Sequence, residues 1–225
     1  MTKFKKIFRK KTEKHLIKEF ISLFKICIAK KEKLNKRFGF VLTGGSSPIN
    51  LYKALSKIKI NWKNIDLFWS DERYVSQKSN NSNFRLVKKH LINKINIDRK
   101  NIFPINTQKK SASEAAKDYE KMIKKYFRNK KVSFDLILLG MGLDGHIASI
   151  FPDNKNLKTN KIISVVSRKD FKRITLNLNT INNAKKIFLW INRKKKSNVY
   201  KKIKSKKEIP VNYLNKSKTN LFFIN

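Results

Sequence analysis

Residues 38–55, FGFVLTGGSSPINLYKAL, contain one complete structural unit. Residues 38–43 are a short apolar run rich in aromatic and β-branched side chains, which predicts a buried strand. A glycine loop follows at Gly44 to Pro48, and Leu51 and Leu55 then recur at helical spacing. A strand, a loop and a helix in this order indicate a parallel α/β sheet.

The same alternation extends in both directions. Before the unit, Thr12 to Leu34 carries apolar residues at helical spacing. After it, apolar runs alternate with helical patterns, so we predict a Rossmann-like α/β fold with a mostly parallel sheet, helices on both faces and a single domain over residues 1–225. Residues 1–11 are expected to be a flexible basic N-terminus. The further predicted strands are 65–69, 134–139, 162–166, 174–178, 187–191 and 221–224, and the further helices are 83–92, 111–127 and one near 197–203.

Composition limits the class of protein. The chain has 225 residues, 40% of them hydrophobic, which suits one substantial core. Lys and Arg total 55 against 15 Asp and Glu, for a net charge of +40, and only 9 of the 55 are Arg. Recognition of phosphates or guanine edges favours the guanidinium group, so the excess of Lys over Arg indicates compositional drift in an A/T-rich genome and no specific nucleic-acid partner.

A basic nucleic-acid-binding protein is the alternative, and nucleic-acid binding that survives ~150 mM salt would support it.

Several other classes are excluded by simple patterns. No apolar run approaches the ~20 residues of a membrane span, and the first ten residues lack the apolar core of a signal peptide. We therefore expect a cytoplasmic protein without a membrane partner, and favour a monomer. The only cysteine is Cys27, and the three histidines are far apart in sequence, so we expect no metal and no other cofactor.

Ligands of a parallel sheet bind beyond the carboxyl ends of its strands, where three loops carry unusual residues. The first is TGGSSP, residues 43–48, whose glycines would let backbone amides approach an anion. It matches neither a Walker loop nor the GxGxxG fingerprint. The alternative is an ordinary strand-to-helix turn with a serine cap.

The other two loops add charge and a histidine. Asp71, Glu72 and Arg73 directly follow a predicted strand, where they could also form a solvated turn. Residues 139–149, LGMGLDGHIAS, present Asp144 and His146 at the start of a predicted helix. An imidazole titrates near neutral pH and can take a proton from water, and a carboxylate can orient it. The alternative is a helix cap or a surface histidine.

Together these loops resemble the 6-phosphogluconolactonase family within the wider glucosamine-6-phosphate isomerase/6-phosphogluconolactonase superfamily. The matching segments are residues 42–55, 65–91 and 134–152, with a weaker match at 173–191. The resemblance implies hydrolysis of 6-phospho-D-glucono-1,5-lactone in the pentose phosphate pathway, without metal or nucleotide. It also implies roles for named residues: His146 as general base, Asp144 orienting it, Arg73 neutralising charge on the sugar acid, Asp71 positioning hydroxyls, and Gly44, Gly45, Ser46, Ser47, Arg173 and Lys196 holding the phosphate.

Two positions separate this reading from the isomerase/deaminase branch of the same superfamily. That branch continues after the histidine as FNEP, with a glutamate that assists ring opening, whereas this chain has Phe151 there. It also has a tyrosine where this chain has Arg73. Both differences favour the lactonase. One departure from the lactonase pattern is the stretch 191–197, INRKKKS, which lacks the usual glycine before the phosphate-binding lysine, so that Lys194, Lys195 and Lys196 remain alternatives.

Overall fold

The computed structural model describes residues 3–153, 159–192, 203 and 208–224. The helix predicted near 197–203 lies almost entirely outside these residues. The strands are β1 Lys6–Lys10, β2 Phe38–Leu42, β3 Ile65–Trp69, β4 Asp71–Arg73, β5 Ile102–Phe103, β6 Leu136–Gly140, β7 Ile163–Ser167, β8 Lys172–Leu176, β9 Ile187–Ile191 and β10 Thr219–Ile224. The helices are α1 Glu13–Glu32, α2 Ile49–Leu55, α3 Asn83–His90, α4 Ala112–Tyr126 and α5 Leu178–Asn182, with short 3-10 turns between some of them.

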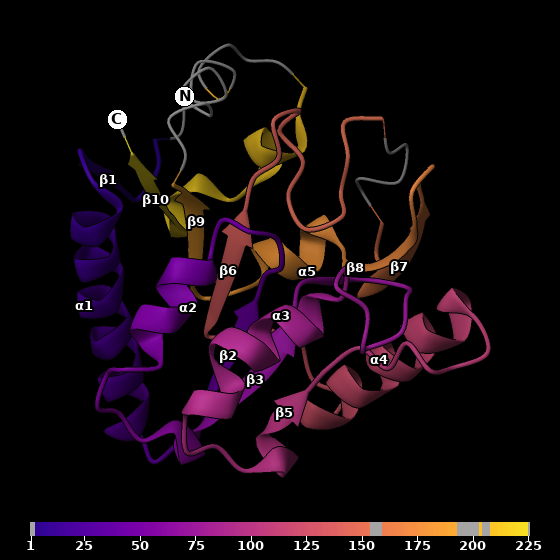
Figure 1. Cartoon of the computed structure of the whole chain (residues 1–225), viewed down its shortest axis with the longest axis horizontal. Helices are drawn as coiled ribbons and strands as arrows, with labels where there is room; N and C mark the ends of the chain where they lie inside the picture. The colour runs from indigo at the N-terminus through magenta and orange to yellow at the C-terminus, as the bar shows by residue number, and fades with distance from the viewer. Residues whose placement is uncertain (1–2, 154–158, 193–202, 204–207, 225) are drawn as a thin grey trace.

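Seven strands form a wholly parallel sheet in the order β1-β10-β9-β6-β2-β3-β5 (Figure 1). From β2 the chain runs outward through β3 to β5, and then returns to β6 on the other side of β2 before continuing outward through β9 and β10. The strand order therefore reverses between β2 and β6. The predicted parallel sheet is confirmed.

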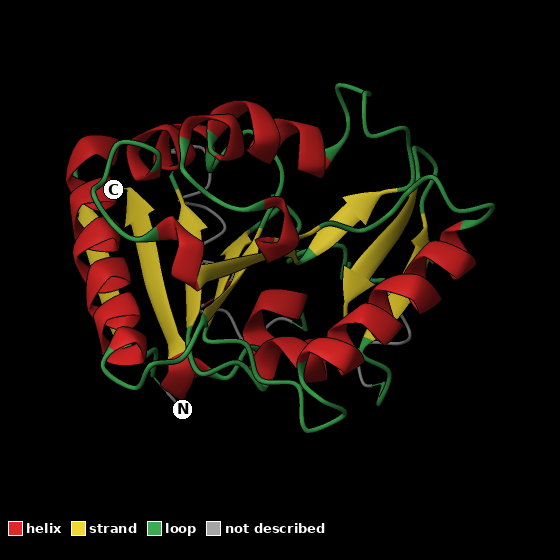
Figure 2. Ribbon diagram, turned by 90° about the horizontal axis from the view of Figure 1, so that it is seen from below, coloured by secondary structure: helices red, strands yellow, loops and turns green. Residues whose placement is uncertain are grey.

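Helices cover both faces of this sheet (Figure 2). Phe40 of β2 pairs with Leu67 of β3, so Phe68 points to the opposite face from Phe40. Helix α1 packs Phe24 against Phe40, with ring centroids 4.9 Å apart. Helix α4 packs Tyr126 against Phe68 from the other side, also at 4.9 Å. The two layers of helices are thus positioned by alternate residues of the central strands.

The later strands correct part of the prediction. β7 and β8 were expected within the parallel sheet, but with β4 they form a separate antiparallel sheet in the order β4-β8-β7. Only residues 168–171 connect β7 to β8, and a parallel pair would need a connection of a dozen or more residues. The apolar pattern predicted the strands but could not report their direction.

The N-terminus is also different from the prediction. Within the segment expected to be a flexible basic N-terminus, residues 6–10 form the strand β1, which lies parallel to β10 at the edge of the large sheet. Phe8 stacks on Phe222 of β10 with ring centroids 4.7 Å apart. Phe8 is the single buried residue of β1, so the segment has too little apolar pattern to be recognised as a strand.

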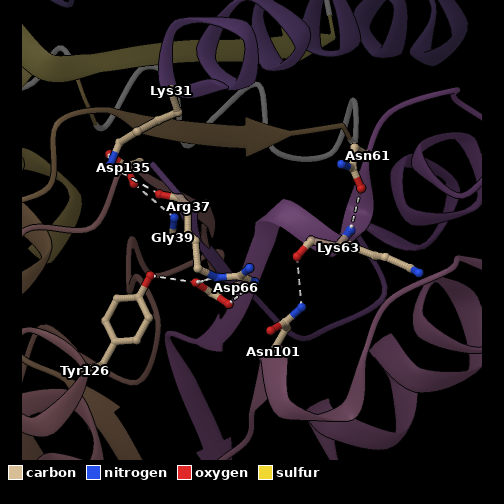
Figure 3. Close-up of polar contacts among 9 residues, drawn as sticks. All are labelled: Lys31, Arg37, Gly39, Asn61, Lys63, Asp66, Asn101, Tyr126 and Asp135. Carbon is tan, nitrogen blue, oxygen red and sulfur yellow. Dashed lines mark hydrogen bonds and ion pairs between the residues drawn. The ribbon is translucent and has the colours of Figure 1, made fainter. Parts of the chain in front are cut away.

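A polar cluster closes the amino ends of the central strands, away from the loops singled out above (Figure 3). Arg37 donates two hydrogen bonds to the buried carboxylate of Asp66, at 2.8 and 2.6 Å, and the Tyr126 hydroxyl donates a third at 2.8 Å. Burial, together with the charge of Asp66, raises the pKa of Tyr126. Asp135 similarly accepts from the Gly39 amide and pairs with Lys31. These contacts join the ends of β2, β3 and β6.

Candidate active site

The three singled-out loops meet beyond the carboxyl ends of β2 and β6, where the strand order reverses. This is the place at which doubly wound sheets bind ligands. A pocket of about 190 Å³ opens there. Its lining residues come from all three loops, from the start of α3 and from β8: Thr43, Gly44, Gly45, Ser46, Ser47, Asp71, Arg73, Asn83, Gly140, Met141, Gly142, His146, Ala148 and Arg173.

The loop after β2 is fixed by hydrogen bonds to its main chain and by the conformation of one glycine. Gly45 has φ +80°, a conformation that favours glycine. The Ser47 carbonyl oxygen accepts hydrogen bonds from Asn192 Nδ2 at 2.7 Å and from Trp190 Nε1 at 3.3 Å, both at the end of β9. Pro48 is the residue that precedes α2, and it makes no side-chain cap. The interpretation of this loop as a serine-capped turn is therefore wrong.

The loop after β6 places His146 beside Asp144. The Nδ1 atom of His146 lies 2.6 Å from Asp144 Oδ1. Burial alone would raise the pKa of Asp144, but the hydrogen bond and charge of His146 lower it to about 2. Because an ionised carboxylate only accepts hydrogen bonds, Nδ1 carries the proton in this pair. That tautomer leaves Nε2 as the nitrogen able to accept a proton.

No helix begins at this loop, contrary to the prediction. Residues 141–150 form turns, with positive φ at Gly145 (92°) and at Ala148 (48°), and a helix cannot accommodate either value. The Gly142 amide instead donates to the His146 carbonyl oxygen at 2.9 Å, which closes the turn. The Phe151 ring packs on the His146 ring at 4.6 Å between centroids.

Asp71 is a buried residue that lines the pocket and accepts two hydroxyl hydrogen bonds. Ser149 Oγ donates to Oδ2 at 2.7 Å, and Ser70 Oγ donates to Oδ1 at 3.1 Å. The Ser149 amide in turn donates to Thr175 Oγ1 of β8. Asp71 therefore links the loop after β3 to the loop that carries His146. The resemblance included Ser149 within a matched segment but assigned it no role.

Two arginines are cross-strand neighbours on adjacent strands of the small sheet. Arg73 of β4 and Arg173 of β8 are directly opposite in the antiparallel register, and both line the pocket. Arg173 Nη2 pairs with Asp170 at 2.5 Å, whereas Arg73 Nη1 donates to neutral acceptors. In each guanidinium group the buried Nε–H has no hydrogen-bond partner among the residues that the structure describes. Like charges placed directly opposite destabilise a sheet, so this pair favours an anion in the pocket.

The sequence assigned no site role to Asn83, which is 1% exposed and also lines the pocket. It was predicted only as the start of a helix, and it is indeed the first residue of α3. Lys194, Lys195 and Lys196 lie outside the described residues. A larger hollow of about 1140 Å³ lies between α4 and β7, but none of the predicted site residues lines it.

No helix among the described residues is both long and apolar enough to span a bilayer, and no cluster of three or more metal-ligating side chains occurs among them. A doubly wound sheet with a polar pocket, a histidine–aspartate pair and two arginines at its reversal point defines an α/β enzyme suited to a small anionic substrate. The chain belongs to the glucosamine-6-phosphate isomerases/6-phosphogluconolactonase family, whose model matches residues 11–223.

Individual relatives agree with this family. The chain is 35% identical over 154 residues to a 6-phosphogluconolactonase of Synechocystis, covering 67% of this chain and 64% of that protein. It is 32% identical to the 6-phosphogluconolactonase of Thermotoga maritima over 82% of each chain. The crystal structure of 6-phosphogluconolactonase from T. maritima aligns with a TM-score of 0.86, covering 97% of this chain and 98% of that one at 26% identity. A monomeric glucosamine-6-phosphate deaminase aligns with the same TM-score at 20% identity, which shows the shared fold alone.

Proposed function

We propose that the chain hydrolyses 6-phospho-D-glucono-1,5-lactone to 6-phospho-D-gluconate, the lactone step of the pentose phosphate pathway. The observation that carries this proposal is the pairing of an oriented imidazole with two arginines in one compact pocket. The substrate has the matching chemistry, since it is an electrophilic ester joined to a phosphate dianion. The similarity to named lactonases over most of the chain supports the same conclusion.

In this proposal His146 is the general base. Its Nε2 takes a proton from water as the water oxygen attacks the lactone carbonyl carbon, and the carbonyl oxygen becomes an oxyanion. The oxyanion collapses, the bond to the ring oxygen breaks, and that oxygen receives the proton from Nε2. Asp144 holds the Nδ1–H and stabilises the imidazolium that exists between the two transfers. Oxyanion donors would be backbone amides of the turn at residues 140–145, of which those of Gly142 and Gly145 already donate hydrogen bonds within the turn.

The remaining roles concern binding. The loop of Gly44, Gly45, Ser46 and Ser47 and the guanidinium of Arg173 would hold the phosphate, with Lys196 as a further contributor. Arg73 would neutralise charge on the sugar acid, and Asp71 would position hydroxyl groups or maintain the loop. Charge-assisted hydrogen bonds of this kind are among the strongest that a pocket can offer a phosphate.

The family also contains isomerases, so the reaction needs a discriminating observation. Phe151 is the residue that packs on the His146 ring, and it replaces the glutamate of the FNEP pattern. A phenyl ring cannot handle a proton during ring opening, whereas lactone hydrolysis needs only one base. The arrangement therefore favours hydrolysis. A cytoplasmic location, a monomeric state and the lack of a specific nucleic-acid partner remain predictions of the sequence.

The decisive experiment is a coupled assay on freshly generated 6-phosphogluconolactone, corrected for spontaneous hydrolysis, with glucosamine 6-phosphate tested in parallel. We expect acceleration of lactone hydrolysis and no release of ammonia from the amino sugar. Lactone hydrolysis at the background rate would refute the proposal. Ammonia release would assign the chain to the other branch.

A further inference from the structure

Asn83 bridges the two ends of β4. Its Nδ2 donates to the main-chain oxygen of Asp71 at 2.9 Å, and its Oδ1 accepts from Nη1 of Arg73 at 2.9 Å. A guanidinium group only donates and a carbonyl oxygen only accepts, so a single orientation of the amide satisfies both partners. The side chain is buried, and these two bonds therefore fix it firmly.

Glu72 holds the main chain from which Asn83 projects. Its carboxylate accepts from the amides of Asn83 and Phe84, both at 2.7 Å, and from the Ser82 hydroxyl at 3.0 Å. It thereby satisfies N–H groups at the start of α3 that no residue within the helix can reach. The contact is reciprocal, because Glu72 reaches from β4 to α3 while the Asn83 amide reaches back from α3 to β4.

Asn83 also packs directly on the loop after β2. A β-carbon at Gly44 would lie 1.8 Å from Asn83 Oδ1 and 2.0 Å from its Cγ, which is far inside contact distance. The glycine at this position is thus required by the neighbouring amide. Asn83 therefore touches both the main chain of the proposed phosphate loop and the side chain of Arg73.

We propose that Asn83 is a positioning residue for Arg73, whose guanidinium it holds at the pocket. The inference rests on the proposed function, in which Arg73 meets the charge of the sugar acid. Arg73 Nη1 keeps a second acceptor, the Asn81 carbonyl oxygen at 2.8 Å. Removal of the Asn83 amide should therefore loosen the position of the Arg73 guanidinium without releasing it completely. We expect Asn83→Ala to lower kcat/KM by about tenfold, in the range for a hydrogen bond to a charged group.

A second buried asparagine provides the matched control. Asn101 is 4% exposed, and its Nδ2 donates to the Lys63 carbonyl oxygen at 3.0 Å, within the cluster at the opposite ends of the strands (Figure 3). Asn101→Ala removes a comparable amide and a comparable main-chain bond, but it touches no pocket residue. It should reduce stability as Asn83→Ala does and leave kcat/KM unchanged.

The test compares Asn83→Ala, Asn101→Ala, Arg73→Ala and the Arg73→Ala/Asn83→Ala double variant. If Asn83 acts through Arg73, the double variant has the same kcat/KM as Arg73→Ala alone. A further tenfold loss in the double variant, or equal kcat/KM in the two asparagine variants, would overturn the inference.

A binding measurement separates this inference from the proposed function. Calorimetric titration with 6-phosphogluconate should show about tenfold weaker binding to Asn83→Ala than to Asn101→Ala. A wild-type chain that fails to hydrolyse the lactone would refute the proposed function, and the titration would then still decide the role of Asn83. Equal affinities in the two variants would refute that role.

Discussion

The Gly142→Ala substitution tests whether the position of His146 controls catalysis. A β-carbon at Gly142 would lie 2.2 Å from both Cε1 and Nδ1 of His146, and 2.6 Å from Asp144 Oδ1. Carbon atoms in ordinary contact are ~3.5 Å apart, so the ring would have to retreat by about 1 Å. A misplacement of ~1 Å can cost about 10²-fold in rate. We therefore expect kcat to fall by about 10²-fold in the lactone assay, with little change in KM.

Two further variants serve as controls for this prediction. Gly39→Ala is the matched glycine control, because a β-carbon there meets its nearest neighbour at 3.7 Å, and its kcat should equal that of the wild type. The double variant Gly142→Ala/His146→Ala should be little slower than His146→Ala, since the atoms nearest to the added methyl group belong to the imidazole and to its partner Asp144. The reasoning fails if Gly142→Ala keeps the wild-type kcat, or if the double variant loses a further 10²-fold.

Four other predictions follow from the contacts described above. His146→Ala should lower kcat by ~10²–10⁴-fold with a modest change in KM, and a near wild-type rate would make the histidine structural. Arg173→Ala should raise KM for the phosphorylated lactone and leave the slow hydrolysis of unphosphorylated gluconolactone nearly unchanged, whereas equal losses on both would indicate a role in folding only. Arg37→Met should leave kcat unchanged and lower the urea-unfolding free energy by about 2–3 kcal/mol, because it removes the ion-pair partner of the buried Asp66 side chain; the loss is smaller than for a fully buried pair because the Arg37 side chain is 43% exposed. Burial raises the pKa of Glu72 to about 7, although four hydrogen bonds to its carboxylate lower it, so the folded chain binds this proton more tightly than the unfolded chain. Glu72 should therefore make the unfolding free energy fall as the pH rises from about 4.5 to about 7. Glu72→Gln should flatten that part of the pH profile of the unfolding free energy.

The parallel sheet could be predicted because its strands are apolar on both faces and alternate with amphipathic helices. The same signal could not give the direction of β7 and β8, because direction depends on the short turn between them and not on side-chain pattern. β1 was missed because Phe8 is its single buried residue and its stability comes from pairing with β10 at the other end of the sequence.

At the site, the sequence indicated Asp144 and His146 because a carboxylate and an imidazole two residues apart, in the loop that follows a buried strand, are suited to acid–base chemistry. The positive φ of Gly145 explains why one position of this loop favours glycine. The constraint on Gly142 is the imidazole ring, which occupies the place of a β-carbon. Asn83 carried no recognisable signal, because its importance arises from contacts with residues far away in the sequence.

The position of β1 has a consequence for the order of folding during synthesis. Among the described strands, β10 is its one hydrogen-bonded neighbour, so residues 6–10 can enter the sheet only after residues 219–224 have left the ribosome. Phe20 of α1 packs on Phe222 of the same late strand. Phe8 and Phe20 therefore lack this packing partner for almost the whole of synthesis, although Phe24 of α1 can already pack on β2. A ribosome stalled just before β10 would hold a chain that invites chaperone binding, although its catalytic loops are already complete.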